Sequence, residues 1–225
     1  MARLIFPLIF GIAGVAVLLS LGFWQLSRLQ EKEAVIAEIV TRISAPPAGL
    51  PEAAEAERDR YLPVVIEGRY TGEVAHVLAS QRELGTGSRV IAVLETGSGR
   101  RILVDRGFLP DAARAGADFA SGSVAVTGNL HWPRDTTDST PPPDLGRGLW
   151  FSRAPEPLAA HLGTEPLLIV ARHDGAGVAG LVTMPVTTID IRNDHLEYAI
   201  TWFLLALVWA GMTGFLLWRI RRGTA

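Results

Sequence analysis

Two long segments without a charged residue, one near each end of the sequence, constrain the fold of this chain most. Residues 4–26 read LIFPLIFGIAGVAVLLSLGFWQL, and residues 198–218 read YAITWFLLALVWAGMTGFLLW. As helices rising about 1.5 Å per residue, both segments reach roughly 30 Å, which is the thickness of the hydrocarbon core of a bilayer. We therefore expect two transmembrane helices, over residues 4–26 and 198–218.

The first segment could instead be the apolar core of a cleaved signal peptide. It is longer than the usual core of about 7–15 residues. The residues that follow it, 25–32, read QLSRLQEK and lack a small-x-small cleavage pattern. We therefore interpret residues 4–26 as a retained membrane anchor.

Basic residues after the second segment predict the orientation, whereas the flanks of the first segment are ambiguous, with Arg3 before it and Arg28 and Lys32 after it. Arg219, Arg221 and Arg222 follow the second segment directly, whereas Arg192 before it stands among acidic residues. Basic flanks favour the cytoplasmic side of a membrane. We therefore expect a multi-pass membrane protein with both termini cytoplasmic and residues 27–197 forming an outer domain, in a bacterial periplasm or an equivalent compartment; the membrane is then the bacterial inner (cytoplasmic) membrane.

The composition excludes several classes of site and partner. Cysteine is absent, which excludes disulfides, thiolate metal sites and covalent haem attachment. The formal net charge is −2 and the arginines are scattered, so we expect no nucleic-acid partner. Nothing resembles a nucleophile elbow, an HExxH motif or a phosphate loop, and we do not expect an enzyme.

The segment between the predicted helices is dominated by strand signals. Short runs rich in β-branched and aromatic residues alternate with turn signals, and the two runs joined by GSG form the clearest hairpin. The predicted strands cover residues 61–70, 73–80, 89–96, 100–109, 123–132 and 167–172. This spacing indicates a mainly antiparallel sheet or partly closed barrel.

The remaining segments complete the predicted fold class. Near-helical spacing of apolar residues beyond residue 26 predicts that the first helix continues until Ala45, Pro46 and Pro47 end it. Residues 154–163 predict a short helix, and residues 136–148 an exposed loop. We predict a membrane α+β protein, in which two transmembrane helices flank one mainly antiparallel β domain with minor helix.

A histidine stands at the start of the second apolar segment. Asp194 and Glu197 have the spacing of a capping box, which would make His195 the first helical residue. There the helix dipole disfavours a second proton on the imidazole and leaves it able to donate a lone pair to a metal. Tyr198 and Trp202 follow at i+3 and i+7, on the same helix face.

The end of the first apolar segment supplies matching residues. Because the two helices run antiparallel, Trp24, Gln25 and Arg28 should lie at about the depth of His195. An imidazole, aromatic rings and arginines such as Arg28 or Arg192 could supply the axial ligand, walls and propionate partners of a haem pocket. The same residue types also serve as membrane-interface anchors, and the pattern alone favours that interpretation.

Other polar residues are more typical of structural roles. Asp105 and Arg106 could form a charged pair at a strand end, with Gly107 allowing a tight bend. The remaining histidines show no spacing that would build a two-histidine metal face: His76, His131, His161 and His173.

Four segments carry a family resemblance: LGFWQLSRLQEK, YLPVVIEGRY, ILVDRGFLP and NDHLEYAITWFLLAL. Their order and spacing resemble the signature segments of the Surfeit locus protein one family, membrane proteins that assist assembly of haem-copper cytochrome c oxidase. The resemblance covers nearly the whole chain. It departs from the family at Asp105, where the family usually has asparagine, and at Phe108, where it usually has tryptophan. The strongest matches are Gly22, Trp24, Gln25, Arg28, His195, Tyr198, Ala199, Trp202 and Phe203.

The resemblance implies a role in supplying or stabilising haem a during maturation of oxidase subunit I. It implies transient haem a binding, with His195 as the axial ligand of the iron. Subunit I is then the expected partner, haem A synthase a candidate haem donor, and membrane lipid the surroundings. The alternative is a scaffold that binds no haem and stabilises subunit I during cofactor insertion. The expected haem-binding residues are His195, Tyr198, Trp202, Trp24, Gln25 and Arg28.

Overall fold

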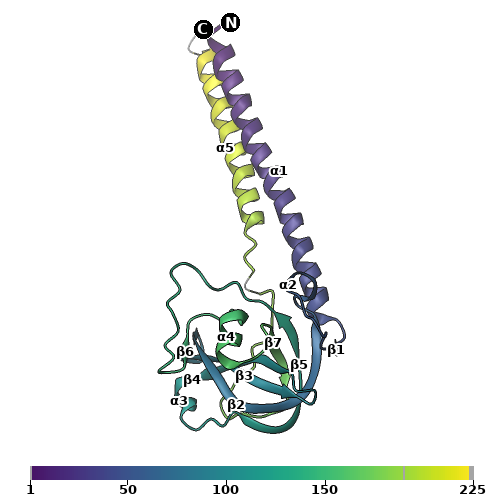
Figure 1. Cartoon of the computed structure of the whole chain (residues 1–225). Coiled ribbons are helices and arrows are strands. Elements are labelled where there is room, and N and C mark those ends of the chain that lie inside the picture. The colour runs from purple at the N-terminus through teal and green to yellow at the C-terminus, as the bar shows by residue number, and fades with distance from the viewer. Residues whose placement is uncertain (1, 190, 223–225) are drawn as a thin grey trace. The chain divides into compact units, whose positions relative to one another are not determined.

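The computed structural model describes residues 2–189 and 191–222, which form two compact units (Figure 1). One unit holds most of helix α1 and all of helix α5, from residues up to 38 and from residue 188 onward. The other unit, residues 39–187, holds the sheet. Two long apolar helices thus flank a mainly β domain, which confirms the predicted fold class.

Helix α1 spans Ala2–Ser44 and is much longer than a bilayer requires. The predicted continuation beyond residue 26 is confirmed, and the helix ends directly before Ala45, Pro46 and Pro47. Proline explains this end, because its ring disfavours the helical conformation of the residue before it.

Helix α5 spans His195–Arg222. Like α1, it is long and apolar enough to cross a membrane. Only 6% of the most apolar window of each helix is buried within the protein. A core helix of a soluble protein would be covered by other elements, so the large exposed apolar faces of α1 and α5 fit contact with lipid.

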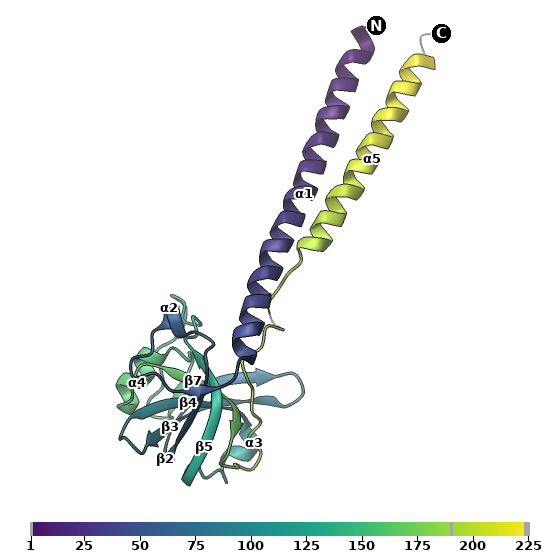
Figure 2. The ribbon, with the colours of Figure 1, turned by 90° about the vertical axis from the view of Figure 1, so that its right-hand side faces the viewer.

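Small residues allow α1 and α5 to pack closely side by side (Figure 2). Gly11, Gly14 and Gly22 of α1 face bulkier side chains of α5, whose Ala199 and Ala206 are buried. Close approach at small residues is the usual basis of helix association in membranes. A methyl group on the three glycines would lie 2.1 to 2.5 Å from side-chain atoms of Thr213, Trp209 and Phe203, respectively.

The strands of the second unit pair in a ring. Their order is β2–β3–β4–β7–β5, and β5 pairs again with β2. All of these pairings are antiparallel except β4–β7, in which only three residue pairs align. This arrangement confirms the mainly antiparallel, partly closed sheet. The strands are β1 (Ala48–Gly49), β2 (Pro63–Gln81), β3 (Gly85–Thr96), β4 (Arg101–Pro110), β5 (Ala120–His131), β6 (Leu149–Trp150) and β7 (Leu168–Asp174).

Several local features differ from the sequence-based expectation. The first two predicted strands are one continuous strand, β2, which bends at an irregularity between Tyr70 and Val74. Gly72 has a φ of +91° within this bend, a conformation that glycine adopts easily. The two-residue strands β1 and β6 were not expected, and neither were the single-turn helices α2 (Ala56–Asp59) and α3 (Asp111–Arg114).

The predicted helix and hairpin are confirmed. Helix α4 spans Pro155–Leu162 and ends at Gly163, whose φ of 63° is left-handed. Strands β3 and β4 pair continuously from Glu95 and Arg101, next to the GSG turn, to Ile91 and Asp105.

Two apolar clusters cover the two faces of the strand ring. Successive side chains of a strand point to opposite faces, so neighbours such as Ile102 and Leu103 enter different clusters. The inner cluster includes Val64, Ile66, Tyr70, Leu94, Ile102, Val104, Val126, Leu130 and Ile169. The outer cluster, which contains residues of α4, includes Ala75, Val77, Ile91, Leu103, Trp150, Leu158, Leu168 and Val170.

The predicted pair between Asp105 and Arg106 is wrong, because each residue pairs elsewhere. The fully buried Arg106 donates from Nε to Asp174 at 2.6 Å, and its guanidinium lies 4.0 Å from the centre of the Tyr70 ring. Asp105 pairs with Arg89 at 2.7 Å. Arg106 is the extra residue of a bulge, at which Val90 and Ile91 align with Gly107 and Asp105.

Gly107 is required at this bulge for two reasons. Its φ is +125°, and a methyl group there would lie 2.1 Å from the carbonyl oxygen of Val182. We expect Gly107→Ala to lower the free energy of unfolding by about 2 kcal/mol or more. Gly99→Ala is the matched control, because Gly99 has a φ of +82° with open space around it. That variant should cost about 1 kcal/mol.

Urea unfolding of the full-length variants in detergent, followed by circular dichroism of the β domain, measures the difference. Equal losses in the two variants would contradict the predicted steric contribution at Gly107.

Two histidines of the β domain lie in apolar surroundings, His76 buried and His131 partly buried. His76 Nδ1 lies 2.9 Å from the Ser88 hydroxyl, and the His131 ring stacks on Tyr61 with centroids 5.5 Å apart. Burial lowers the pKa of both rings from 6.5 to about 4. Between these values the unfolded chain binds more protons than the folded one, so stability is lost as pH falls through this window.

We expect the double variant His76→Gln/His131→Gln to weaken this pH dependence between pH 6.5 and 4. The measurement is urea unfolding at several pH values. His173→Gln, at an exposed position of the same domain, is the control substitution. An unaltered slope in the double variant would show that other groups cause the acid sensitivity.

Candidate functional site

His195 and Gln25 meet across the two apolar helices. His195 is the first residue of α5, as predicted, and its Nδ1 lies 2.8 Å from Oε1 of Gln25 in α1. The two residues stand 170 positions apart in the sequence. The close antiparallel packing of α1 and α5 therefore creates this contact.

This contact determines which ring nitrogen of His195 keeps a lone pair that can bind a metal. An amide oxygen carries no proton, so Nδ1 must donate the hydrogen bond to Oε1 of Gln25. A neutral imidazole has one N–H, and its lone pair then remains on Nε2. Metal-binding histidines typically have this arrangement, because an acceptor at the other nitrogen fixes the tautomer and the ring orientation.

The start of α5 differs in detail from the predicted capping box. The Asp194 carboxylate accepts from Arg192, with Nε at 3.1 Å. Its backbone carbonyl accepts the first helical bond, from the Tyr198 N–H at 3.2 Å. The guanidinium is a charged donor two residues away, which makes it a stronger partner than a backbone amide. Arg192, a predicted propionate partner, is thus already engaged in an ion pair.

Trp24 and Arg28 form a second contact close to Gln25, near the middle of α1. The Arg28 guanidinium lies 5.9 Å from the centre of the Trp24 ring and pairs with Glu31 at 2.7 Å. Trp24 is 53% exposed, and both partners of the Arg28–Glu31 pair are also exposed. An aromatic face and a cation are therefore accessible one helical turn or less from Gln25.

Among the residues that the structure describes, Tyr198 and Trp202 are not fixed by a polar partner on α1 as His195 is. They share a helix face with His195 by their spacing, and Tyr198 is 55% exposed. Ala199 beside them is buried. Within residues 2–189 and 191–222, neither Tyr198 nor Trp202 makes a polar contact with α1. The structure thus brings His195 together with Gln25, and Trp24 with Arg28.

The number of protein ligands near His195 indicates which kind of metal centre fits there. In the described part of the chain, no group of three or more His, Cys, Asp or Glu residues could hold a metal ion. His195 itself offers one ring nitrogen to a metal. A single imidazole suits an iron whose equatorial ligands come from a porphyrin, and it does not suit a bare zinc ion. The residues present fit a haem.

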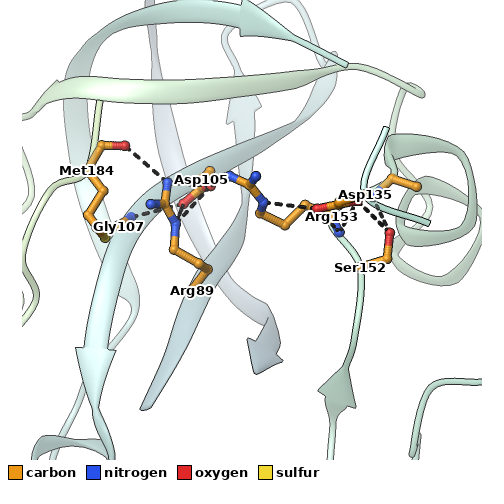
Figure 3. A network of polar contacts seen from close by, with 8 residues as sticks. Arg89, Asp105, Gly107, Asp135, Ser152, Arg153 and Met184 are labelled. Carbon is orange, nitrogen blue, oxygen red and sulfur yellow. Dashed lines mark hydrogen bonds and ion pairs between the residues drawn. The ribbon is translucent and has the colours of Figure 1, made fainter. Parts of the chain in front are cut away.

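A separate polar network, not predicted from the sequence, surrounds Asp105 in the β domain (Figure 3). The buried Asp105 carboxylate accepts from Arg89 at 3.0 Å and 2.7 Å and from the Gly107 N–H at 3.2 Å. Arg89 also donates to the Met184 carbonyl at 3.1 Å. The network therefore ties the segment after β7 to the sheet.

Arg153 extends this network to the loop before α4. Its guanidinium lies 3.5 Å from Asp105 and 3.3 Å from Asp135. Asp135 also accepts from the Ser152 hydroxyl at 2.8 Å. Each of these carboxylates has basic partners, which indicates a structural role. Sequence spacing carried no signal for this network, since Arg89 and Arg153 lie 16 and 48 positions from Asp105.

Comparison with known proteins supplies a family context. The sequence model of the SURF1 family matches residues 12–207, a range that includes Gln25 and His195. A SURF1-like protein of Rickettsia felis is 30% identical over 208 residues, which cover 85% of this chain and 88% of that protein. A SURF1-like protein of Monosiga brevicollis is 29% identical over 215 residues, covering 87% and 82%. Surfeit locus protein 1 of Rattus norvegicus is 27% identical over 206 residues, covering 81% and 66%.

The hydrogen bond between Gln25 and His195 predicts a single tautomer of the ring. We expect the proton on Nδ1 in the parent protein, and mixed tautomers in Gln25→Leu, which removes the acceptor. The measurement is the ¹⁵N chemical shifts of full-length protein labelled in histidine, with His195→Ala identifying the signals. Gln30→Leu is the control, because Gln30 is exposed on the same helix. A parent spectrum with the proton on Nε2 would contradict the predicted tautomer.

Proposed function

The chain belongs to the SURF1 family, and from this premise we propose that it binds haem a and assists its delivery to subunit I of cytochrome c oxidase. Membership of this family implies a role in cytochrome c oxidase assembly. Haem a binding, subunit I as partner and a non-enzymatic mode of action are our proposals for this chain.

The contact between His195 and Gln25 carries the haem proposal. The Nδ1–H of His195 donates a hydrogen bond to the amide oxygen of Gln25. The lone pair of Nε2 then remains free to bind the haem iron. The hydrogen bond also restrains rotation of the ring, so less ordering is needed when a ligand binds. A histidine that served only as an interfacial anchor would not require a partner on the other helix.

Neighbouring residues would contact the other parts of the haem. When bound, the haem supplies an iron that takes a nitrogen ligand along its axis. His195 would provide that ligand, and the aromatic rings of Trp24, Tyr198 and Trp202 would contact the macrocycle. Arg28 would pair with a propionate, exchanging its exposed contact with Glu31 for another carboxylate.

The exposed position of these residues supports transfer rather than permanent retention. Trp24 and Tyr198 are more than half exposed. A haem held by one histidine and open aromatic walls can leave by exchange of a single axial bond. We propose that this exchange takes place in the membrane, with both termini cytoplasmic and the β domain in the periplasm. The arginines after α5 support this orientation.

The same exposure also favours a second candidate function. An open surface at Trp24 and Tyr198 could contact subunit I directly, so that the protein acts as a scaffold without binding haem. The two functions differ in whether His195 carries a ligand, and they can be separated by one preparation.

The test is to purify the full-length protein from cells that make haem A and to record its absorbance. We expect a haem spectrum in the parent and its loss, by at least tenfold, in His195→Ala. His173→Ala is the matched control, because His173 is exposed on the β domain. It should retain the parent's haem content.

Co-purification of subunit I distinguishes the outcomes. If parent and His195→Ala are equally free of haem and retain subunit I equally, the scaffold function is correct and the haem proposal is wrong. Equal haem in both proteins would show that the ligand lies elsewhere.

A further inference from the structure

An apolar groove lies between α1 and α5, at the ends of the helices remote from His195. Its volume is about 440 Å³, within the range of about 300–1,000 Å³ that small-molecule sites occupy. We call it the aromatic groove. The side chains that define it include Phe6, Phe10, Trp209, Met212, Phe215 and Leu216.

Contacts between aromatic rings join the two walls of the aromatic groove. Phe10 stacks on Phe6 with centroids 6.3 Å apart and tilts against Trp209 at 5.5 Å. Phe6 remains 76% exposed and Met212 66% exposed. The groove is lined almost wholly by hydrocarbon, so it suits an occupant without polar groups at this depth.

Two arginines continue the same side of α5 beyond the aromatic groove. Arg219 follows Phe215 by four residues, and Arg222 follows it by seven, which places both close to the helix face that lines the groove. The Arg222 guanidinium lies 4.1 Å from the centre of the Trp218 ring, which positions it at this end of the helix. Guanidinium groups are well suited to bind phosphate.

We propose that the aromatic groove, with Arg219 and Arg222, binds one anionic phospholipid. One acyl chain lies in the groove, and the headgroup phosphate contacts the two guanidinium groups. The order of the site along α5, apolar first and cationic at the helix end, matches the order of chain and headgroup in a lipid. A zwitterionic lipid fits less well, because its ammonium group would lie near the arginines.

The chemistry of the groove favours a lipid over a helix of another protein. Closely packed membrane helices usually meet at small residues. The aromatic groove is walled by bulky aromatic side chains, and the guanidinium groups at its end attract an anion. Trp209 stands 14 residues after His195, roughly 21 Å along the helix, so the lipid site is separate from the proposed haem site.

The test measures lipid retention by purified full-length protein in detergent, using native mass spectrometry. The probes are phosphatidylglycerol and phosphatidylethanolamine with identical acyl chains. We expect one phosphatidylglycerol to be retained in preference. In Arg219→Gln/Arg222→Gln this preference should fall about twenty- to thirtyfold, since one arginine near an anionic lipid contributes roughly fivefold.

Further variants separate the contribution of the groove from that of the headgroup site. Met212→Trp fills the aromatic groove and should lower retention of phosphatidylglycerol. Ala210→Trp fills a different apolar groove, lined by Gly11 and Gly214, and should leave retention unchanged. Arg221→Gln is the charge control, because Arg221 lies two residues from Arg219 and thus on the opposite side of the helix. Circular dichroism confirms that all variants remain folded.

Three results would overturn the proposal. Equal retention of the two lipids by the parent would exclude a headgroup preference. If Arg221→Gln lowered the preference for phosphatidylglycerol as much as Arg219→Gln/Arg222→Gln does, the basic residues would act together without a defined site. Full displacement of the lipid by glycerol phosphate would show that the acyl chain contributes nothing.

Discussion

The close packing of α1 against α5 is the constraint on which the candidate site depends. Gly11, Gly14 and Gly22 allow bulky side chains of α5 to approach the α1 backbone. This approach brings His195 within 2.8 Å of Gln25. A larger residue at any of these glycines would clash with the side chains of Thr213, Trp209 or Phe203. The small residues of α1 therefore permit the approach of the two helices that carry Gln25 and His195.

Polar groups in the β domain serve a different purpose. Asp105, Arg106 and Gly107 are consecutive, yet the two charged side chains enter separate networks on opposite sides of the strand. Arg106 reaches Asp174 within the ring of strands, whereas Asp105 joins Arg89 and the segment after β7. Buried charges are tolerated here because each has a partner of opposite sign. The motif therefore organises the domain, while the proposed haem chemistry depends on the helices.

Sequence patterns predicted the elements of regular structure well, for reasons that are local. The long uncharged segments, the GSG hairpin and the α4 helix with Gly163 as its cap follow from hydrophobicity and backbone preference. The fusion of two predicted strands into β2 was missed, because Gly72 indicates a turn and a bend within a strand equally well. The pairing of Asp105 was missed for another reason. Adjacent charges suggest a pair, but neighbouring strand residues point to opposite faces.

The sequence by itself determined that the chain has two apolar helices around a β domain, and that His195 begins the second of them. It also supplied the ordered motifs that indicate the family. Only the tertiary structure decided that Gln25 is the partner of His195, that Arg89 and Arg153 meet Asp105, and that an aromatic groove ends at Arg219. Helix and strand preferences act over a few residues, whereas these contacts join residues far apart in the chain, and packing alone selects such partners.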